Sequence, residues 1–224
     1  MERKIITTSD GSTTIQLVDW NEQYHSIHGA IQEAYHVFIK HGLSLFENQK
    51  VNILEIGFGT GLNAIITSIE AEKINLAIHY VGVEAFPVKQ EEIAQLNYIT
   101  QLEAEDFKNQ FELMHACQWE KEEQISKNFL LTKQQKDFTE IKASDTFNLI
   151  YFDAFGARVQ PELWTEEIFS IMFKALKENG VLVTYAAKGS VRRAMQAVGF
   201  LVEKLPGPPG KREMLRARKI STKS

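Results

Sequence analysis

The chain has 224 residues, 44% hydrophobic and 24% charged, with a formal net charge of −4, a composition typical of one globular domain that can bury a core. It contains no apolar run near the ~18 residues of a membrane span, no signal-peptide pattern, one cysteine (Cys117) and no HExxH-like histidine spacing. We therefore expect a cytoplasmic protein that forms no intrachain disulfide and binds neither a membrane nor a metal.

The charges are distributed unevenly along the chain. Residues 1–187 carry a net charge of −12, whereas residues 188–224 carry +8. A basic segment on an acidic protein is typical of chains that bind a polyanion such as a nucleic acid. A solvated basic tail gives the same pattern, so composition alone leaves both interpretations open.

The apolar pattern predicts strands and helices in alternation. Asp10-Gly11 between two apolar runs predicts a hairpin, and apolar residues at helical spacing between Ser26 and Gly42 predict a helix. The later predicted elements are strands at 51–56, 79–84, 129–132, 147–152 and 181–185, and helices at 62–69, from Pro87, at 161–177 and at 191–198. Two closing strands, at 200–202 and 212–216, have no helix between them, which predicts an antiparallel pairing.

This alternation predicts the fold class. It is typical of an α/β fold with a doubly wound, mostly parallel sheet, here with an antiparallel C-terminal strand. Neither internal repeats nor low-complexity linkers interrupt the chain. We expect a single domain, 1–224, with a small N-terminal hairpin and helix extension at 1–48 and a Rossmann-like core at 49–224.

A glycine cluster follows the first buried strand, in the sequence Glu55-Ile56-Gly57-Phe58-Gly59-Thr60-Gly61. Glycines at such a strand-to-helix turn let the backbone approach a ligand closely. A dinucleotide fingerprint needs a glycine at position 62, where this chain has Leu62, so a pyrophosphate cradle is disfavoured. The acidic Glu55 before the loop suits the ammonium and sulfonium groups of S-adenosylmethionine. A purely structural turn is the alternative.

Three further acidic residues follow predicted strands, near the edge of the sheet where parallel strands end. Glu84 can accept hydrogen bonds from both hydroxyls of a ribose, and Asp137 from an adenine amino group. Asp153 would face the methyl group, where a carboxylate can orient an amine nucleophile or accept its proton. The alternatives are a solvated strand-end glutamate for Glu84 and a helix or loop cap for Asp153.

Several motifs, in order along the chain, resemble one family. They are the segment 24–34 with His36-Val37-Phe38, the loop from Glu55 to Asn63, Glu84-Ala85-Phe86-Pro87, Asp153-Ala154-Phe155 with 161–165, Gly189-Ser190-Val191-Arg192-Arg193 with Gly199-Phe200, and Lys211-Arg212-Glu213-Met214-Leu215. Over roughly residues 19–218, the chain resembles the methyltransferase domain of bacterial MnmC-type enzymes that modify the wobble uridine of tRNA.

The resemblance implies a Rossmann-like, class I, S-adenosylmethionine-dependent methyltransferase. Members of that family methylate the exocyclic amine of 5-aminomethyluridine, or of its 2-thio form, at the tRNA wobble position. In many bacteria the domain is fused to an FAD-dependent oxidoreductase that makes the aminomethyl substrate. This chain shows no second glycine fingerprint. We therefore expect the stand-alone form, with tRNA as its partner and a separate oxidoreductase acting upstream.

The residues and the resemblance together assign the expected site. The expected cofactor residues are Glu55, Gly57, Phe58, Gly59, Gly61, Asn63, Glu84 and Asp137. Asp153 is expected to act on the amine, Tyr24, Trp164 and Lys188 to border the substrate entrance, and Lys188, Arg192, Arg193, Lys211, Arg212 and Arg216 to contact phosphates of the anticodon arm. The remaining alternatives are a methyltransferase or aminopropyltransferase for another amine, and a non-catalytic cofactor- or RNA-binding module.

Overall fold

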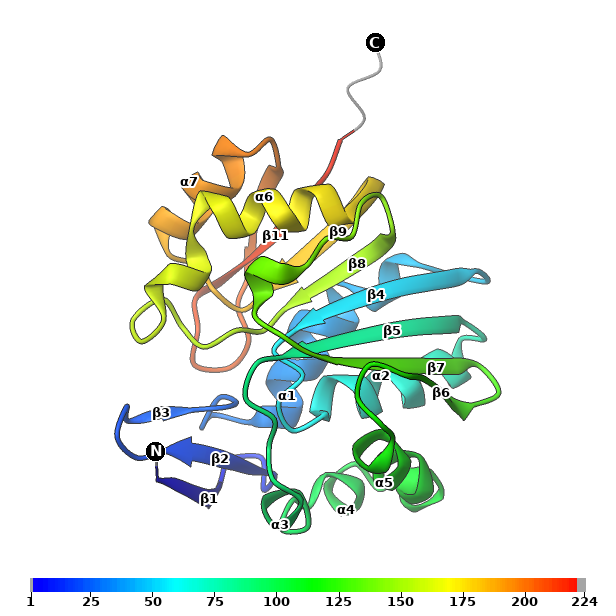
Figure 1. Ribbon diagram of the computed structural model, residues 1–224. Coiled ribbons are helices and arrows are strands. Elements are labelled where there is room, and N and C mark those ends of the chain that lie inside the picture. Colours follow the sequence, from blue (N-terminus) through cyan, green and yellow to red (C-terminus); the bar gives the residue numbers. More distant parts are fainter. Residues whose placement is uncertain (1, 221–224) are drawn as a thin grey trace.

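The computed structural model describes residues 2–220, so residue 1 and residues 221–224 of the expected domain lie outside the described residues. Its centre is an eight-stranded sheet (Figure 1). The strands, in spatial order, are β10 (Leu201–Pro206), β11 (Glu213–Arg218), β9 (Leu176–Thr184), β8 (Phe147–Phe152), β4 (Lys50–Ile56), β5 (Ala77–Glu84), β7 (Phe129–Gln135) and β6 (Glu122–Ser126).

Most neighbours in this sheet run parallel. The pairs β9–β8, β8–β4, β4–β5 and β5–β7 are parallel, whereas β11 is antiparallel to both β9 and β10. The predicted α/β class and the antiparallel C-terminal strand are therefore confirmed. At the other edge β6 pairs antiparallel with β7, a strand that the sequence analysis missed because its residues are largely polar.

Helices cover both faces of the sheet (Figure 1). On one face lie α1 (Ala30–Ala34), the π-helical turn η1 (Tyr35–Lys40), α2 (Leu62–Lys73) and α5 (Lys108–Ala116), and on the other α6 (Glu166–Ala175) and α7 (Gly189–Ala197). Side chains alternate along β4, so Ile53 packs on the α2 side, whereas Leu54 and Ile56 pack on the α6 side. Within residues 2–220, no helix is long and apolar enough to cross a membrane.

The N-terminal residues form a second, three-stranded antiparallel sheet from β1 (Arg3–Thr7), β2 (Thr13–Leu17) and β3 (Glu22–Gln23). The predicted hairpin is present, with Ile5 opposite Ile15. Asp10 fixes its turn, because Oδ1 accepts a hydrogen bond from the backbone N–H of Ser12 (3.1 Å) and Oδ2 one from that of Gln32 in α1 (3.0 Å). The hairpin and the first helix are thus tied together.

Two predicted helices differ in the structure. The helix expected at 161–177 is divided into a short 3-10 turn, η5 (Pro161–Trp164), and α6, because the hydroxyl of Thr165 accepts a hydrogen bond from the N–H of Ile168 and caps α6. It also ends early, where β9 begins. Pro87 precedes rather than begins α3 (Gln90–Ile93), whose N-cap is Lys89.

The segment between β5 and β6 contains further helices that the sequence analysis did not predict. They are α4 (Tyr98–Gln101), the 3-10 turn η3 (Glu105–Phe107) and α5. Elsewhere in the chain, two more 3-10 turns are η2 (Leu43–Leu45) and η4 (Phe138–Glu140). The hydroxyl of buried Tyr98 donates a hydrogen bond to Thr60 in the glycine loop (3.0 Å). This hydrogen bond ties α4 to the glycine loop.

Burial of side chains on the central strands stabilises this fold, and two leucines, one buried and one exposed, test this. Leu182 in β9 is fully buried, whereas Leu201 in β10 is 50% exposed. We expect Leu182→Ala to lower the free energy of unfolding by about 2–5 kcal/mol, because it leaves a cavity in the core. Leu201→Ala should change it by about 0.5 kcal/mol or less. Urea denaturation of both variants measures the difference; equal losses would contradict this assignment.

Candidate active site

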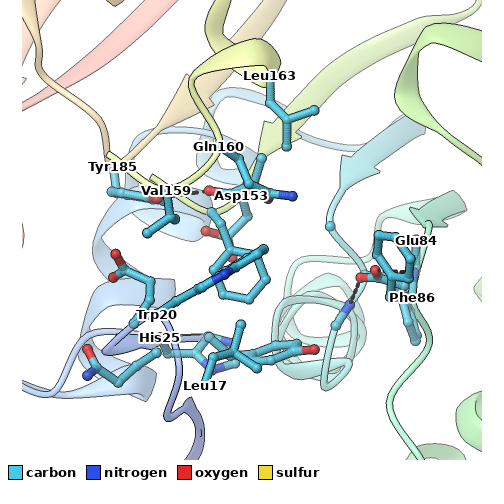
Figure 2. Close-up of a pocket in the computed structure, with 18 of the residues that line it drawn as sticks. Leu17, Trp20, His25, Glu84, Phe86, Asp153, Val159, Gln160, Leu163 and Tyr185 are labelled. Atoms are coloured by element: carbon cyan, nitrogen blue, oxygen red, sulfur yellow. Dashed lines mark hydrogen bonds between the residues drawn. The ribbon is translucent and has the colours of Figure 1, made fainter. Parts of the chain in front are cut away.

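A cavity of about 810 Å³ opens at the carboxyl ends of the parallel strands. Residues that follow β4, β5 and β8 line it, and so do Leu17, Trp20 and residues 22–27 of the N-terminal sheet region. In Figure 2, Glu84 and Phe86 lie at one end of this space and Asp153 and Tyr185 at the other. Ligands of open α/β sheets bind at this edge, so the cavity is the candidate active site.

The glycine loop presents its backbone to the cavity. Gly57 has a φ of +88° and Gly59 a φ of +49°, which favour glycine. A Cβ at Gly57 would lie 2.8 Å from the carbonyl oxygen of Asp153, and one at Gly59 would lie 3.1 Å from the ring of Tyr24. Both glycines line the cavity as predicted, whereas Gly61, which precedes α2, does not.

Phe58 lies between the two glycines and anchors the loop. It lines the cavity, but its side chain is 3% exposed and its ring packs edge-on against His115 and Trp119. A Cβ at Gly82 in β5 would lie 2.4 Å from that ring, so only glycine fits opposite it. The side chain of Phe58 therefore acts mainly in packing under the loop.

Glu84, at the end of β5, joins the glycine loop to the next segment. Its Oε2 accepts a hydrogen bond from the N–H of Gly59 (3.0 Å), and its Oε1 accepts one from the N–H of Phe86 (2.9 Å). The Phe86 ring beside it is 70% exposed. A carboxylate and an open aromatic ring thus lie together at this end of the cavity, as Figure 2 shows.

Asn63 links two carboxyl groups. Its Nδ2 donates hydrogen bonds to Oε1 of Glu55 (2.9 Å) and Oδ2 of Asp153 (2.8 Å). Glu55 is fully buried under the loop and does not line the cavity, and this burial raises its pKa well above the usual range. Asn63 and Asp153 line the cavity, whereas the predicted contact of Glu55 with a ligand stays a prediction.

Asp153 follows β8 and faces a second group of charges. Burial, with the carboxylate of Glu33 as the next cause, raises the pKa of Asp153 to about 7, although Asn63 and the ammonium of Lys211 favour its ionised form. Lys211 donates a hydrogen bond to Glu33 and lies 3.9 Å from the ring centroid of Tyr185. Lys211, expected to contact phosphates, thus lines the cavity instead.

Asp137 lines the cavity beyond β7 and also caps η4. It accepts hydrogen bonds from the N–H of Thr139 (2.8 Å) and from its hydroxyl (2.6 Å). These bonds lower the pKa of Asp137, so its charged form is favoured. Asp137 therefore lies at the cavity, and its predicted contact with an adenine amino group stays a prediction.

Aromatic side chains line the half of the cavity near Asp153. Phe155 packs edge-on against Tyr24 (ring centroids 5.0 Å apart) and Trp20 (6.1 Å). Tyr24 was expected here. Phe155 belongs to the Asp153-Ala154-Phe155 motif but was given no role, and Trp20 lies in no motif. Trp164, expected at the entrance, is buried and does not line the cavity; its indole N–H donates to the carbonyl of Phe155 (2.8 Å) and holds that loop.

His25, within the motif segment 24–34, also lines the cavity. Its Nδ1 lies 3.1 Å from the hydroxyl of Thr14 and its Nε2 3.4 Å from that of Thr60. Burial lowers the pKa of His25 to about 4, so it is neutral at physiological pH. It connects the N-terminal sheet with the glycine loop.

The other predicted basic residues lie outside the cavity. Lys188, Arg193 and Arg212 are exposed, and Arg192 is half-buried on α7. Arg216 forms an ion pair with Glu203 across β11 and β10 (2.9 Å), so its charge is already compensated. Within residues 2–220, no group of acidic, histidine and cysteine side chains has the arrangement of a metal site.

The cavity fits S-adenosylmethionine, the cofactor expected from the sequence. Its volume lies within the range of small-molecule sites. The carboxylates of Glu84, Asp137 and Asp153 complement the positive charges and hydroxyl groups of such a ligand. The side-chain oxygen of Asn63 is buried with no hydrogen-bond partner among the described residues, which leaves an acceptor at the cavity wall.

Comparison with known proteins agrees with this fit. A family model described as S-adenosyl-L-methionine-dependent methyltransferase matches residues 94–220. The tRNA 5-methylaminomethyl-2-thiouridine biosynthesis bifunctional protein MnmC of Hydrogenovibrio crunogenus is 26% identical over 96% of this chain, and that of Idiomarina loihiensis 27% identical over 90%. These alignments cover 34% and 36% of the two relatives, so the chain spans about a third of their length.

Comparison with solved structures also finds an MnmC protein. The crystal structure of MnmC2 from Aquifex aeolicus matches with a TM-score of 0.77 and 25% identity, over 96% of this chain and 69% of that one. Spermidine synthase from Thermotoga maritima matches with a TM-score of 0.58 and 15% identity, over 97% of this chain and 68% of that one, which shows the fold alone. The chain belongs to the family of S-adenosyl-L-methionine-dependent methyltransferases.

Proposed function

We propose that this protein methylates the aminomethyl nitrogen of 5-aminomethyluridine, or of its 2-thio form, at the wobble position of tRNA. The observation that carries the proposal is the carboxyl group of Asp153, which faces the cavity with a pKa of about 7. Similarity to proteins named for 5-methylaminomethyl-2-thiouridine biosynthesis supports the choice of substrate. We place the reaction in the cytoplasm, after an oxidoreductase step that makes the aminomethyl group.

The end of the cavity near Glu84 holds the cofactor. Bound S-adenosylmethionine supplies the electrophilic methyl group. Glu84 already accepts two backbone hydrogen bonds, but a carboxylate has further lone pairs for ribose hydroxyls. Asp137 accepts from the adenine amino group, and the backbone of Gly57 and Gly59 lets the ligand approach closely.

The end near Asp153 receives the amine. A primary amine is mostly protonated at neutral pH and cannot act as a nucleophile until it loses a proton. Asp153, with a pKa of about 7, takes that proton and holds the nitrogen in line for attack. Trp20 and Phe155 offer aromatic surfaces on which the extruded uridine can stack.

Basic side chains next to the cavity contact the RNA backbone. Lys188 and Arg193 lie where α7 begins, a few residues after the cavity residue Tyr185. Arg192 is on the same helix, and Arg212 follows the cavity residue Lys211. Such contacts position a nucleic acid without reading its sequence.

The reaction can be tested with purified protein, S-adenosylmethionine and tRNA that carries 5-aminomethyl-2-thiouridine. Mass spectrometry of the nucleosides should show the 5-methylaminomethyl product. Asp153→Asn should lower the rate about 100-fold or more, because the proton acceptor is lost, while S-adenosylhomocysteine affinity changes less than about threefold. Asp106→Asn, at an exposed aspartate, is the control. An unmodified nucleoside with wild-type protein would refute the function; full activity of Asp153→Asn would refute only its role.

The pair Glu33–Lys211 should set the pH dependence through Asp153. Because only ionised Asp153 accepts a proton, kcat/KM should rise as the pH increases through about 7. Lys211→Met removes the charge that lowers the pKa of Asp153, so the rise should move up by about half a pH unit or more. Glu33→Gln removes the charge that raises it, so the rise should move down. The free amine ionises identically in each assay, and unchanged midpoints would contradict this coupling.

RNA contact by α7 predicts a change in salt dependence. The double variant Arg192→Gln/Arg193→Gln should weaken tRNA binding and reduce the slope of log K against log salt by up to about two, because fewer counterions are released. Filter binding at several KCl concentrations measures the slope. Lys121→Gln/Lys127→Gln, at exposed lysines near the β6–β7 edge, is the matched control. Equal slopes for both doubles would exclude α7 as the RNA site.

A further inference from the structure

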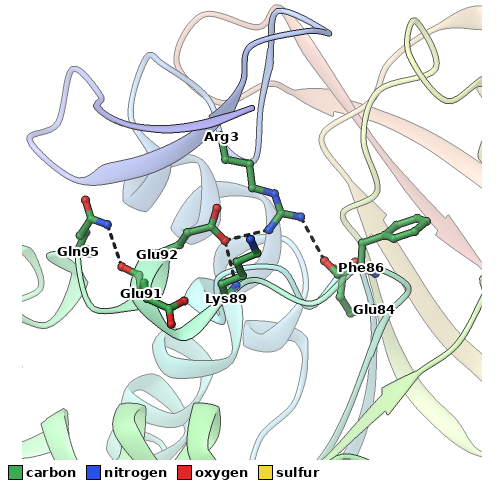
Figure 3. Close-up of polar contacts among 7 residues, drawn as sticks. All are labelled: Arg3, Glu84, Phe86, Lys89, Glu91, Glu92 and Gln95. Atoms are coloured by element: carbon green, nitrogen blue, oxygen red, sulfur yellow. Dashed lines mark hydrogen bonds and ion pairs between the residues drawn. The ribbon is translucent and has the colours of Figure 1, made fainter. Parts of the chain in front are cut away.

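Arg3, in the first strand of the N-terminal sheet, contacts the segment that follows Glu84 (Figure 3). Its Nη1 donates a hydrogen bond to Oε2 of Glu92 (2.9 Å), and its Nη2 lies 3.5 Å from the carbonyl oxygen of Phe86. The side chains of Arg3 and Glu92 are only 19% and 16% exposed. Water therefore screens this ion pair less than a surface pair.

Glu92 also fixes the start of α3. The same oxygen that accepts from Arg3 accepts a hydrogen bond from the backbone N–H of Lys89, the residue that precedes this short helix. A helix of four residues has little stability of its own. Its position depends on this hydrogen bond and on the guanidinium that holds the Glu92 carboxylate.

The other end of the segment is fixed by Glu84. That carboxylate binds the N–H of Phe86 and the N–H of Gly59 in the glycine loop. Residues 85–89 are thus held between Glu84 on one side and Arg3 with Glu92 on the other, as Figure 3 shows. The exposed ring of Phe86 lies on this segment, at the cavity.

Arg3 has a second partner in the same cavity. Its guanidinium carbon lies 5.8 Å from the ring centroid of Tyr24. Tyr24 packs against Gly59 of the glycine loop and against Phe155 on the amine side. One guanidinium therefore contacts both the segment after Glu84 and the aromatic wall.

We propose that Arg3 is a positioning residue for the cofactor, which clamps segment 85–89 against the N-terminal sheet and so sets the place of Glu84 and Phe86. The inference rests on the proposed cofactor end of the cavity, but it does not depend on tRNA as the substrate. It makes the N-terminal sheet part of the cofactor site, although Arg3 itself need not touch the ligand.

Calorimetric binding of S-adenosylhomocysteine to the full chain tests the clamp without any turnover. Arg3→Met should raise the dissociation constant about fivefold or more, within the usual range of coupling between sites. Glu92→Gln should raise the dissociation constant by a similar factor. The double variant should bind no more weakly than the weaker single variant, because each substitution removes the same Arg3–Glu92 contact. Arg3→Lys should recover part of the affinity. Lys4→Met, at the exposed Lys4–Glu2 pair, should change nothing.

Thermal unfolding of each variant, recorded beside its affinity, separates positioning from folding. Arg3→Met with a dissociation constant within about twofold of wild type, or additive losses in the double variant, would overturn the clamp. If Arg3→Met fails to fold, Arg3→Lys and Glu92→Gln still decide the matter. Absence of binding by the wild-type chain would refute the cofactor site itself. Methyl transfer to tRNA is a separate assay, so its failure would leave this inference standing.

Discussion

One amide group, Nδ2 of Asn63, bridges the carboxyl groups of Glu55 and Asp153 by donating a hydrogen bond to each. Glu55 is on the α2 side of β4 because side chains alternate along a strand, and Asn63 reaches it from the first turn of α2. Burial favours the neutral form of Glu55. Asp153, at the end of the neighbouring strand β8, is left as the group whose charge changes near neutral pH.

This arrangement needs a cover, since an open crevice would return Asp153 to water and lower its pKa. The N-terminal sheet region provides that cover with Tyr24 and His25, both of which contact the glycine loop. Residues 2–28 therefore complete the site. The sequence analysis described 1–48 as an extension, and the structure makes part of that extension a wall of the cavity.

Much of the fold could be predicted because its strands are short apolar runs followed by glycine or acidic residues. Glu84, Asp137 and Asp153 were placed correctly at the edge of the sheet by this rule alone. The aromatic wall could not be predicted, since Trp20 lies in no motif and Phe155, although it follows Asp153 and Ala154 in one, has the local pattern of a core residue. Trp164, expected at the entrance, is buried instead, because its ring packs against Phe152 and Phe169 on the α6 side of the sheet.

The net charge of the basic C-terminal segment overestimates the number of cations that are free to bind a phosphate backbone. Lys204 pairs with Glu213, Arg216 with Glu203 and Lys219 with Asp145, so three of the cations are compensated within the chain. Lys211 is turned into the cavity, where it is paired with Glu33. Among the described residues of this segment, the cations outside these ion pairs are Lys188, Arg192, Arg193, Arg212 and Arg218. Because α7 begins a few residues after the cavity residue Tyr185, under the proposed function an RNA bound to α7 would bring its extruded base to the end of the cavity near Asp153 rather than near Glu84.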